Sequence, residues 1–200
     1  VPEARNIISG NAVNGGFGNI SIGSNSSGSN VTVQGNYIGT DVTGTRAIAD
    51  SFSGISLSSS NNVIGGTVAG ARNVISGNRT GIDIGGHISV TVRGNIIQGN
   101  LIGLNALGNG QVPNSLQGIV LADASDNTIG GTQSGAANTI AFNGGQGVIV
   151  SSGTGNSIRG NSIFSNAGLG IDLANNTFPF GGVTPNDPDD TDTGANLLQN

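Results

Sequence analysis

The side chains that could carry out acid–base or metal chemistry are few in this chain: eleven acidic residues, six arginines and one histidine among 200 residues. Four of the acids gather near the C-terminus, at Asp187, Asp189, Asp190 and Asp192. Carboxylate oxygens at near-alternate positions suit Ca²⁺, which is a hard cation. The segment lacks the fixed spacing and closing glutamate of an EF-hand loop. Two interpretations therefore stay open, a structural Ca²⁺ site and a plain acidic linker, and no other cofactor is indicated.

A second group of charged residues, Asp41, Arg46 and Asp50, shares one long segment that interrupts the repeat pattern described below. Two carboxylates and a guanidinium could bind the hydroxyl groups of a sugar, and an internal ion pair is the alternative. The corresponding segment, 64 residues later, has Asn105 and Asn109 but no charged residue. This loss of charge in the second copy argues against a single catalytic constellation and leaves Asp41, Arg46 and Asp50 as candidate ligand-binding residues.

The remaining titratable residues are too scattered to predict a catalytic site. Glycoside hydrolysis needs two carboxyl groups about 5 to 9.5 Å apart. Asp83 and Asp172 stand three repeat turns apart, a separation of about 14 Å, and we expect both to be solvated surface residues. Asp123 and Asp126 are expected in a turn, and His87 at a solvated corner. No residue is predicted to be catalytic.

Composition excludes several classes of protein. Charged residues make up 8% of the chain, the net charge is −5, and the six arginines form no basic stripe, so we predict no binding of nucleic acid. The absence of cysteine excludes disulfides and thiolate metal sites. No apolar run reaches the roughly 18 residues that a spanning helix needs, so we predict no membrane span.

Glycine, asparagine and β-branched residues recur in a pattern that predicts the fold. Phrases of the form Gly-apolar-x-apolar begin at Gly54, Gly81, Gly118, Gly147 and Gly170, with a looser copy at Gly18. Phrases of the form Asn-x-Ile/Val-x-x-Asn lie between them, and their period of two indicates strands. Three short strands in a turn of about 23 residues predict an all-β solenoid, a parallel β-helix of about six coils.

Such coiling returns the same side chain to the same place in every turn. It predicts that Ile82 stacks between Ile55 and Ile119, about 4.8 Å from each. It also predicts that the recurrent asparagines form hydrogen-bonded ladders along the corners. Two long insertions, at 39–53 and 103–117, are expected to emerge from the same corner.

The rhythm ends near Leu173, which divides the chain into predicted coils at 1–173 and a C-terminal capping or acidic tail at 174–200. A solenoid end exposes unpaired backbone that needs a cover, and Phe178, Phe180, Leu197 and Leu198 could supply one. The chain opens inside a repeat phrase and contains no methionine. We therefore expect further domains of a longer chain.

The phrases at 61–78 and 35–44, and the tail at 184–200, resemble the right-handed β-helix repeats of large bacterial secreted and cell-surface proteins, within the pectate-lyase-like fold group. The resemblance implies a right-handed, single-stranded parallel β-helix and an extracellular location, with polysaccharides or cell-surface glycans as partners. Two hypotheses follow for function, because this fold hosts many activities. One is a non-catalytic structural or adhesive module, favoured by the scarcity of charge. The other is a carbohydrate-active enzyme, a polysaccharide lyase or glycoside hydrolase, or a degenerate relative of one.

Overall fold

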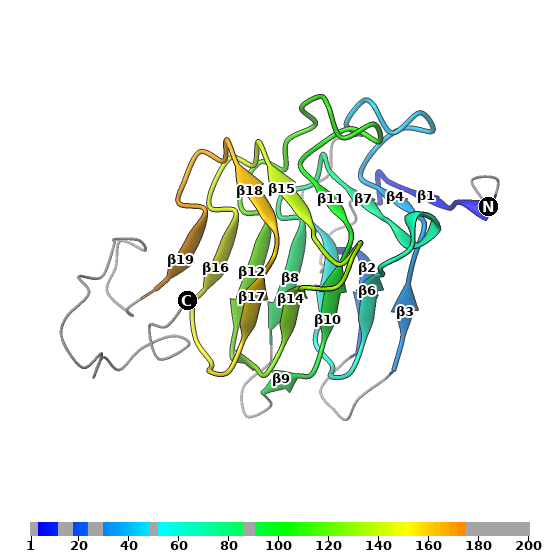
Figure 1. Ribbon diagram of the computed structural model, residues 1–200. Helices are drawn as coiled ribbons and strands as arrows, with labels where there is room; N and C mark the ends of the chain where they lie inside the picture. Colours follow the sequence, from blue (N-terminus) through cyan, green and yellow to red (C-terminus); the bar gives the residue numbers. More distant parts are fainter. Residues whose placement is uncertain (1–3, 12–17, 24–29, 49–51, 86–90, 175–200) are drawn as a thin grey trace.

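The computed structural model describes residues 4–11, 18–23, 30–48, 52–85 and 91–174, and almost all regular structure in these ranges is β-strand. Three parallel sheets run side by side along one stack (Figure 1). Sheet 1 contains β1 (Ile7–Ile8), β4 (Tyr37–Ile38), β7 (Val74–Ile75), β11 (Leu101–Ile102), β15 (Thr139–Ala141) and β18 (Ser162–Phe164). Sheet 2 contains β3 (Thr32–Val33), β6 (Val63–Gly65), β10 (Ile96–Gln98), β14 (Thr128–Gly130) and β17 (Ser157–Arg159). Sheet 3 contains β2 (Gly18–Ile22), β5 (Ser53–Leu57), β8 (Ile82–Gly85), β12 (Ile119–Ala122), β16 (Val148–Val150) and β19 (Ile171–Leu173).

The chain visits the three sheets in a fixed rotation, so that each strand pairs with the strand one turn before and one turn after it. From β3 onward the order is sheet 2, sheet 1, sheet 3, repeated to β19, apart from a small extra pair formed by β9 (Val92–Arg93) and β13 (Ala124–Ser125). All of these named strand pairs are parallel. The architecture is therefore a parallel β-solenoid, in agreement with the prediction from the repeats.

The register confirms the predicted stacking of side chains. Ile82 pairs with Ile55 on one side and with Ile119 on the other. In sheet 1 a column of isoleucines continues through the whole stack, at Ile8, Ile38, Ile75, Ile102, Ile140 and Ile163. The four inner members are fully buried, whereas the two end members are only partly buried. The core is thus a set of apolar columns that each coil buries against its neighbours.

A second, smaller apolar cluster lies on the outer side of sheet 1. It contains the buried residues Tyr37, Val74, Leu101, Leu104 and Ala141, with Ala106 and Phe142 packed against them. Leu104 and Ala106 come from the second long insertion, so this outer cluster attaches that insertion to the body of the solenoid. Within the described ranges no helix is long and apolar enough to cross a membrane; the 3₁₀ turn η2 (Ala69–Ala71) has only three residues.

Candidate functional site

The dominant polar feature of the molecule is a set of three asparagine ladders that run along its corners. Each ladder precedes the strands of one sheet, and in each ladder the Nδ2 group of one asparagine donates to the Oδ1 atom of the asparagine in the next coil. Ladder I precedes sheet 1 and contains Asn6, Asn36, Asn73, Asn100, Asn138 and Asn161. Ladder II precedes sheet 2 and contains Asn62, Asn95, Asn127 and Asn156. Ladder III precedes sheet 3 and contains Asn78, Asn114, Asn143 and Asn166. At the start of the stack Asn11 donates to Asn19, which lies within β2, and Asn19 donates to Asn78.

Asn100 shows how completely one rung is used. Its Oδ1 atom accepts from the backbone N–H and from the Nδ2 group of Asn73, at 3.3 and 2.9 Å. Its Nδ2 group donates to the carbonyl of Ile64 at 2.9 Å and to Oδ1 of Asn138 at 3.0 Å. Its own N–H donates to the same Oδ1 atom at 3.0 Å. The side chain is 0% exposed, so every one of these bonds is made away from water.

The ladders confirm the prediction that the recurrent asparagines stack. An amide at each corner satisfies the N–H and carbonyl groups that the bend between two sheets leaves without a strand partner. A buried polar group costs free energy unless it is hydrogen-bonded, and here the partners are supplied coil by coil. The ladder amides are therefore occupied with one another, and their role is structural.

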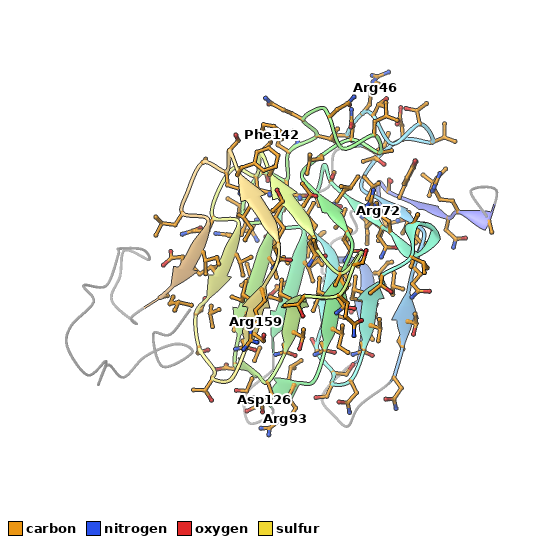
Figure 2. The ribbon with its side chains drawn as sticks, in the orientation of Figure 1. Arg46, Arg72, Arg93, Asp126, Phe142 and Arg159 are labelled. Atoms are coloured by element: carbon orange, nitrogen blue, oxygen red, sulfur yellow. The ribbon has the colours of Figure 1, made fainter. Side chains whose placement is uncertain are left out.

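The two long insertions form matched loops, here called loop 1 (residues 39–48) and loop 2 (residues 103–112). Each loop is closed by an antiparallel bridge, Thr40 with Ala47 and Leu104 with Gln111. The loops are also joined to each other, because the N–H of Ala106 donates to the carbonyl of Gly44 at 2.8 Å. They emerge together at one corner, as expected, and Arg46 marks the outer end of loop 1 (Figure 2).

The candidate ligand residues of loop 1 are only partly brought together. Oδ1 of Asp41 accepts from the hydroxyl of Thr43 at 2.8 Å and from the N–H groups of Thr45 and Arg46 at 3.1 and 3.4 Å. These bonds, led by that of the Thr43 hydroxyl, lower the pKa of Asp41 even though burial opposes them. Asp41 thus contacts the backbone of Arg46, while the guanidinium of Arg46 is exposed. Asp50 lies outside the described residues.

Loop 2 repeats this turn without the charge. Oδ1 of Asn105 accepts from the N–H of Asn109 at 3.1 Å, and its Nδ2 group donates to Oδ1 of Asn109 at 3.0 Å. A short polar side chain that accepts from the backbone a few residues later is the usual device of such turns. The matched positions Asp41 and Asn105 therefore share a structural role.

The tips of both loops present apolar side chains to solvent. Val42 is 71% exposed and Leu107 is 76% exposed. Neither residue was singled out from the sequence. The sequence does indicate these positions. An offset of 64 residues aligns the turn Asp41-Val-Thr-Gly44 with the turn Asn105-Ala-Leu-Gly108. Each turn contains an apolar residue between its first and last positions, where a turn is exposed to solvent.

The carboxylates of sheet 3 occupy one outward column but do not meet. The register runs from Asp83 through Val120 and Ile149 to Asp172, so two apolar residues separate the two acids. Burial raises the pKa of Asp83, and the charge of Arg79 opposes this shift. The separation of three coils that the sequence predicted is therefore present.

The expectation that Asp172 is a solvated surface residue is wrong. Its side chain is 1% exposed, and its Oδ2 atom accepts from Nε2 of Gln146 at 3.0 Å. The neighbouring Ile149, which faces the same way, is 4% exposed. An outward position on this sheet is not open to water at its last coils, and period-two alternation alone cannot show that.

Asp123 and Asp126 are both exposed. Asp126 forms a long ion pair with Arg93 at 3.9 Å, with both side chains well exposed (Figure 2). Asp123 accepts from the hydroxyl of Ser152 at 2.9 Å. Both aspartates have positive φ, in agreement with the expected turn. Asp187, Asp189, Asp190 and Asp192, the candidate Ca²⁺ ligands, lie outside the described residues, as does His87.

In the part of the chain that the structure describes, no three or more His, Cys, Asp or Glu side chains cluster so as to hold a metal ion. Comparisons with protein-family models, with curated proteins and with solved structures found no match to the chain.

Proposed function

We propose that the chain is a non-catalytic structural and adhesive module of an extracellular bacterial protein, a rigid rod that presents loops 1 and 2 to glycans. The observation that carries the proposal is the use of the buried amides in ladders I to III, which supports a structural role for most of the polar groups. A module of this kind needs stiffness and a projecting contact surface, and it needs no convergent acid–base groups.

We take the coils to be right-handed, because connections between parallel strands of one sheet are right-handed in about 98% of cases. About six coils would fill residues 1–173, with residues 174–200 as a C-terminal cap. The extracellular location and the further domains of a longer chain rest on the resemblance of the repeat phrases to bacterial surface proteins.

The paired loops suit adhesion because they are held firmly and end in exposed groups. Loop 2 is anchored in the outer apolar cluster through Leu104 and Ala106, and loop 1 is hydrogen-bonded to it. A preorganised loop loses little conformational entropy on binding. The exposed aliphatic side chains of Val42 and Leu107 could pack against the apolar face of a sugar ring, and the exposed Arg46 of loop 1 could contact hydroxyl or acidic groups.

Binding of the chain to immobilised neutral and acidic polysaccharides tests this function. The variant Val42→Asp/Leu107→Asp should lose binding, whereas Val68→Asp should keep it, since Val68 is 68% exposed but belongs to a different insertion. Product formation from the same polysaccharides is measured in parallel. Binding without products supports the module; absence of binding to every polysaccharide, or retention by the double variant, counts against it.

The alternative is a carbohydrate-active enzyme or its degenerate descendant, and one observation favours it. Carboxyl groups whose pKa is raised by burial occur at catalytic sites, and the partly buried Asp83 has a raised pKa. If products form, the variant Asp83→Asn decides whether Asp83 is responsible, because an amide of the same size cannot donate an acidic proton.

Structural Ca²⁺ in the acidic tail is tested by thermal unfolding with Ca²⁺ and with excess EDTA. The full chain is compared with a chain that ends at Leu173. Stabilisation by Ca²⁺ of the full chain alone is the expected result, because an ion bound only in the folded state raises the unfolding midpoint. A response of neither chain would remove the metal from the proposal.

A further inference from the structure

Three asparagines of this chain are followed directly by glycine: Asn14, Asn109 and Asn143. In such a pair the backbone nitrogen of the glycine can attack Cγ of the asparagine side chain, since glycine has no Cβ atom to hinder the approach. Asn14 lies outside the described residues. Asn109 and Asn143 are followed by the same residue but have opposite surroundings, and this contrast is independent of any glycan binding.

The pair Asn143–Gly144 is held inside ladder III. Asn143 is 1% exposed, and its Nδ2 group donates to Oδ1 of Asn166 at 2.8 Å. Its Oδ1 atom accepts from Nδ2 of Asn114 at 2.8 Å. The N–H of Gly144, which would have to attack, donates to the carbonyl of Asn114 at 2.9 Å. The reaction at this pair must therefore wait until the coils open locally and break these bonds.

The pair Asn109–Gly110 lies in loop 2, where the same two groups are free. Asn109 is an exposed residue, and Gly110 is half-buried. Among the described residues, nothing accepts a hydrogen bond from Nδ2 of Asn109 or from the N–H of Gly110. Only the Oδ1 atom of Asn109 is held in that part of the chain, by Nδ2 of Asn105 at 3.0 Å. The attacking nitrogen and the leaving amide are thus both open to water.

We propose that Asn109 is a site of spontaneous modification, at which the folded protein loses ammonia through a cyclic imide. The nitrogen of Gly110 forms a bond to Cγ of Asn109, and its proton passes through water to Nδ2. The Cγ–Nδ2 bond breaks, and Nδ2 leaves as ammonia. Water then opens the ring at either carbonyl and leaves aspartate or isoaspartate at position 109. No oxidant or reductant takes part, and one neutral amide becomes one negative charge.

The hydrogen bond from Asn105 favours the reaction at Asn109 and also suits its product. During the attack negative charge builds up on Oδ1, and a donor already placed at that atom stabilises this charge. Asn143 has an equivalent donor in Asn114, so the freedom of the glycine N–H and of Nδ2 is what distinguishes the two pairs. The carboxylate of an aspartate product would accept the same bond from Asn105, which then becomes charge-assisted.

Loop 2 acquires in this way a property that its matched loop already has. Residues 103–112 contain no charged side chain, whereas loop 1 contains Asp41 and Arg46. An isoaspartate product would also lengthen the main chain between Leu104 and Gln111, whose bridge closes the loop. The surface of loop 2 therefore changes in charge and in shape as the protein ages.

Cleavage by hydroxylamine tests whether the ring forms in the folded chain. At mildly alkaline pH hydroxylamine attacks the ring and cuts the chain after the asparagine. We expect the folded chain to give the fragments 1–109 and 110–200, and unfolding in urea to add a comparable cut after Asn143. Equal cutting after both residues in the folded chain, or none after Asn109, would overturn the proposal. Resistance of Asn143 in urea would do the same, because the fold would then not be what protects it.

Ageing of the protein at mildly alkaline pH tests the modification itself. The background variant Asn14→Gln leaves Asn109 and Asn143 as the asparagines followed by glycine. Tandem mass spectrometry should find conversion at Asn109 at least about tenfold faster than at Asn143, which reacts only from locally opened coils. Ion-exchange chromatography should show a new acidic form in this background. Asn14→Gln/Asn109→Gln should lack that form, because the longer side chain must close a larger ring. An acidic form that accumulates as fast in the double variant would refute the proposal.

Discussion

Two asparagines five residues apart show how differently the body and the loops of this molecule use the same side chain. Asn100 is a rung of ladder I, is 0% exposed and binds two neighbouring coils. Asn105 lies in loop 2 and closes a turn within its own loop. Position 105 corresponds to Asp41 in loop 1, whereas ladder I has asparagine at every rung. Burial, and not the residue type, decides whether the amide can be replaced.

Alanine at the two asparagines should give the largest difference. Asn100→Ala would leave the N–H and one Nδ2 hydrogen of Asn73 and the carbonyl of Ile64 without partners. At about 1 to 3 kcal/mol for each of these three unsatisfied buried groups, the free energy of unfolding should fall by about 3 to 9 kcal/mol. Asn105→Ala should cost about 1 kcal/mol, as the loss of a helix cap does. Urea unfolding of both variants measures the difference, and similar losses would contradict the distinction.

Glycine to alanine gives a second contrast between body and loop. Gly103 has φ of +85°, and a Cβ atom there would overlap the carbonyl oxygen of Ala141 in the next coil. Gly108 has φ of +71°, but its Cβ would meet only Leu101 at ordinary contact distances of 3.7 and 3.8 Å. We expect a loss of about 2 to 4 kcal/mol for Gly103→Ala, from strain and overpacking together, and about 1 to 2 kcal/mol for Gly108→Ala, from strain alone. Equal thermal midpoints for the two variants would show that the close approach of the coils at Gly103 is unimportant.

The body of the molecule could be predicted from sequence because its interactions repeat. The phrases beginning at Gly54, Gly81 and Gly118 fixed which isoleucines stack, and the five-residue spacing of asparagines such as Asn73 and Asn78 indicated the ladders. In a stack of coils, equivalent residues of neighbouring coils contact one another, so one repeat pattern predicts many contacts at once.

The loops and the outer surface could not be predicted in the same way. The carboxylate of Asp41 accepts from its own turn, a choice that depends on backbone geometry and not on which charges are near in sequence. Asp172 is buried and accepts from Gln146 of the preceding coil, a contact that alternation along the strand does not predict. The exposure of Val42 and Leu107 follows from the turn that each loop makes. Each of these features occurs once or twice in the chain, so the repeat pattern does not predict it.

Asparagine in place of aspartate should have opposite effects in the body and in the loop. Burial raises the pKa of Asp83 in the folded chain, so folding favours the protonated form. The wild-type chain should therefore be most stable below the pKa of the unfolded carboxyl and lose stability as pH rises through the raised pKa. Asp83→Asn does not titrate and should be more stable than the wild type at neutral pH, with the gain vanishing in acid. Denaturant midpoints as a function of pH measure this, and a loss at neutral pH would mean that the carboxylate of Asp83 is stabilising.

The same substitution in loop 1 should give the smallest effect, with the other sign. The hydroxyl of Thr43 and the N–H groups of Thr45 and Arg46 lower the pKa of Asp41, so its ionised form stabilises the folded loop. That contribution is present above the pKa of the unfolded carboxyl and is lost as pH falls through the lowered pKa. Asp41→Asn should thus unfold at a slightly lower denaturant concentration at neutral pH, and the difference should shrink in acid. The reciprocal variant Asn105→Asp, in the matched turn of loop 2, should show a slight gain at neutral pH. If both exchanges instead weaken the chain by as much as Asn100→Ala does, the loops are as closely integrated as the ladders, and the contrast between body and loop does not hold.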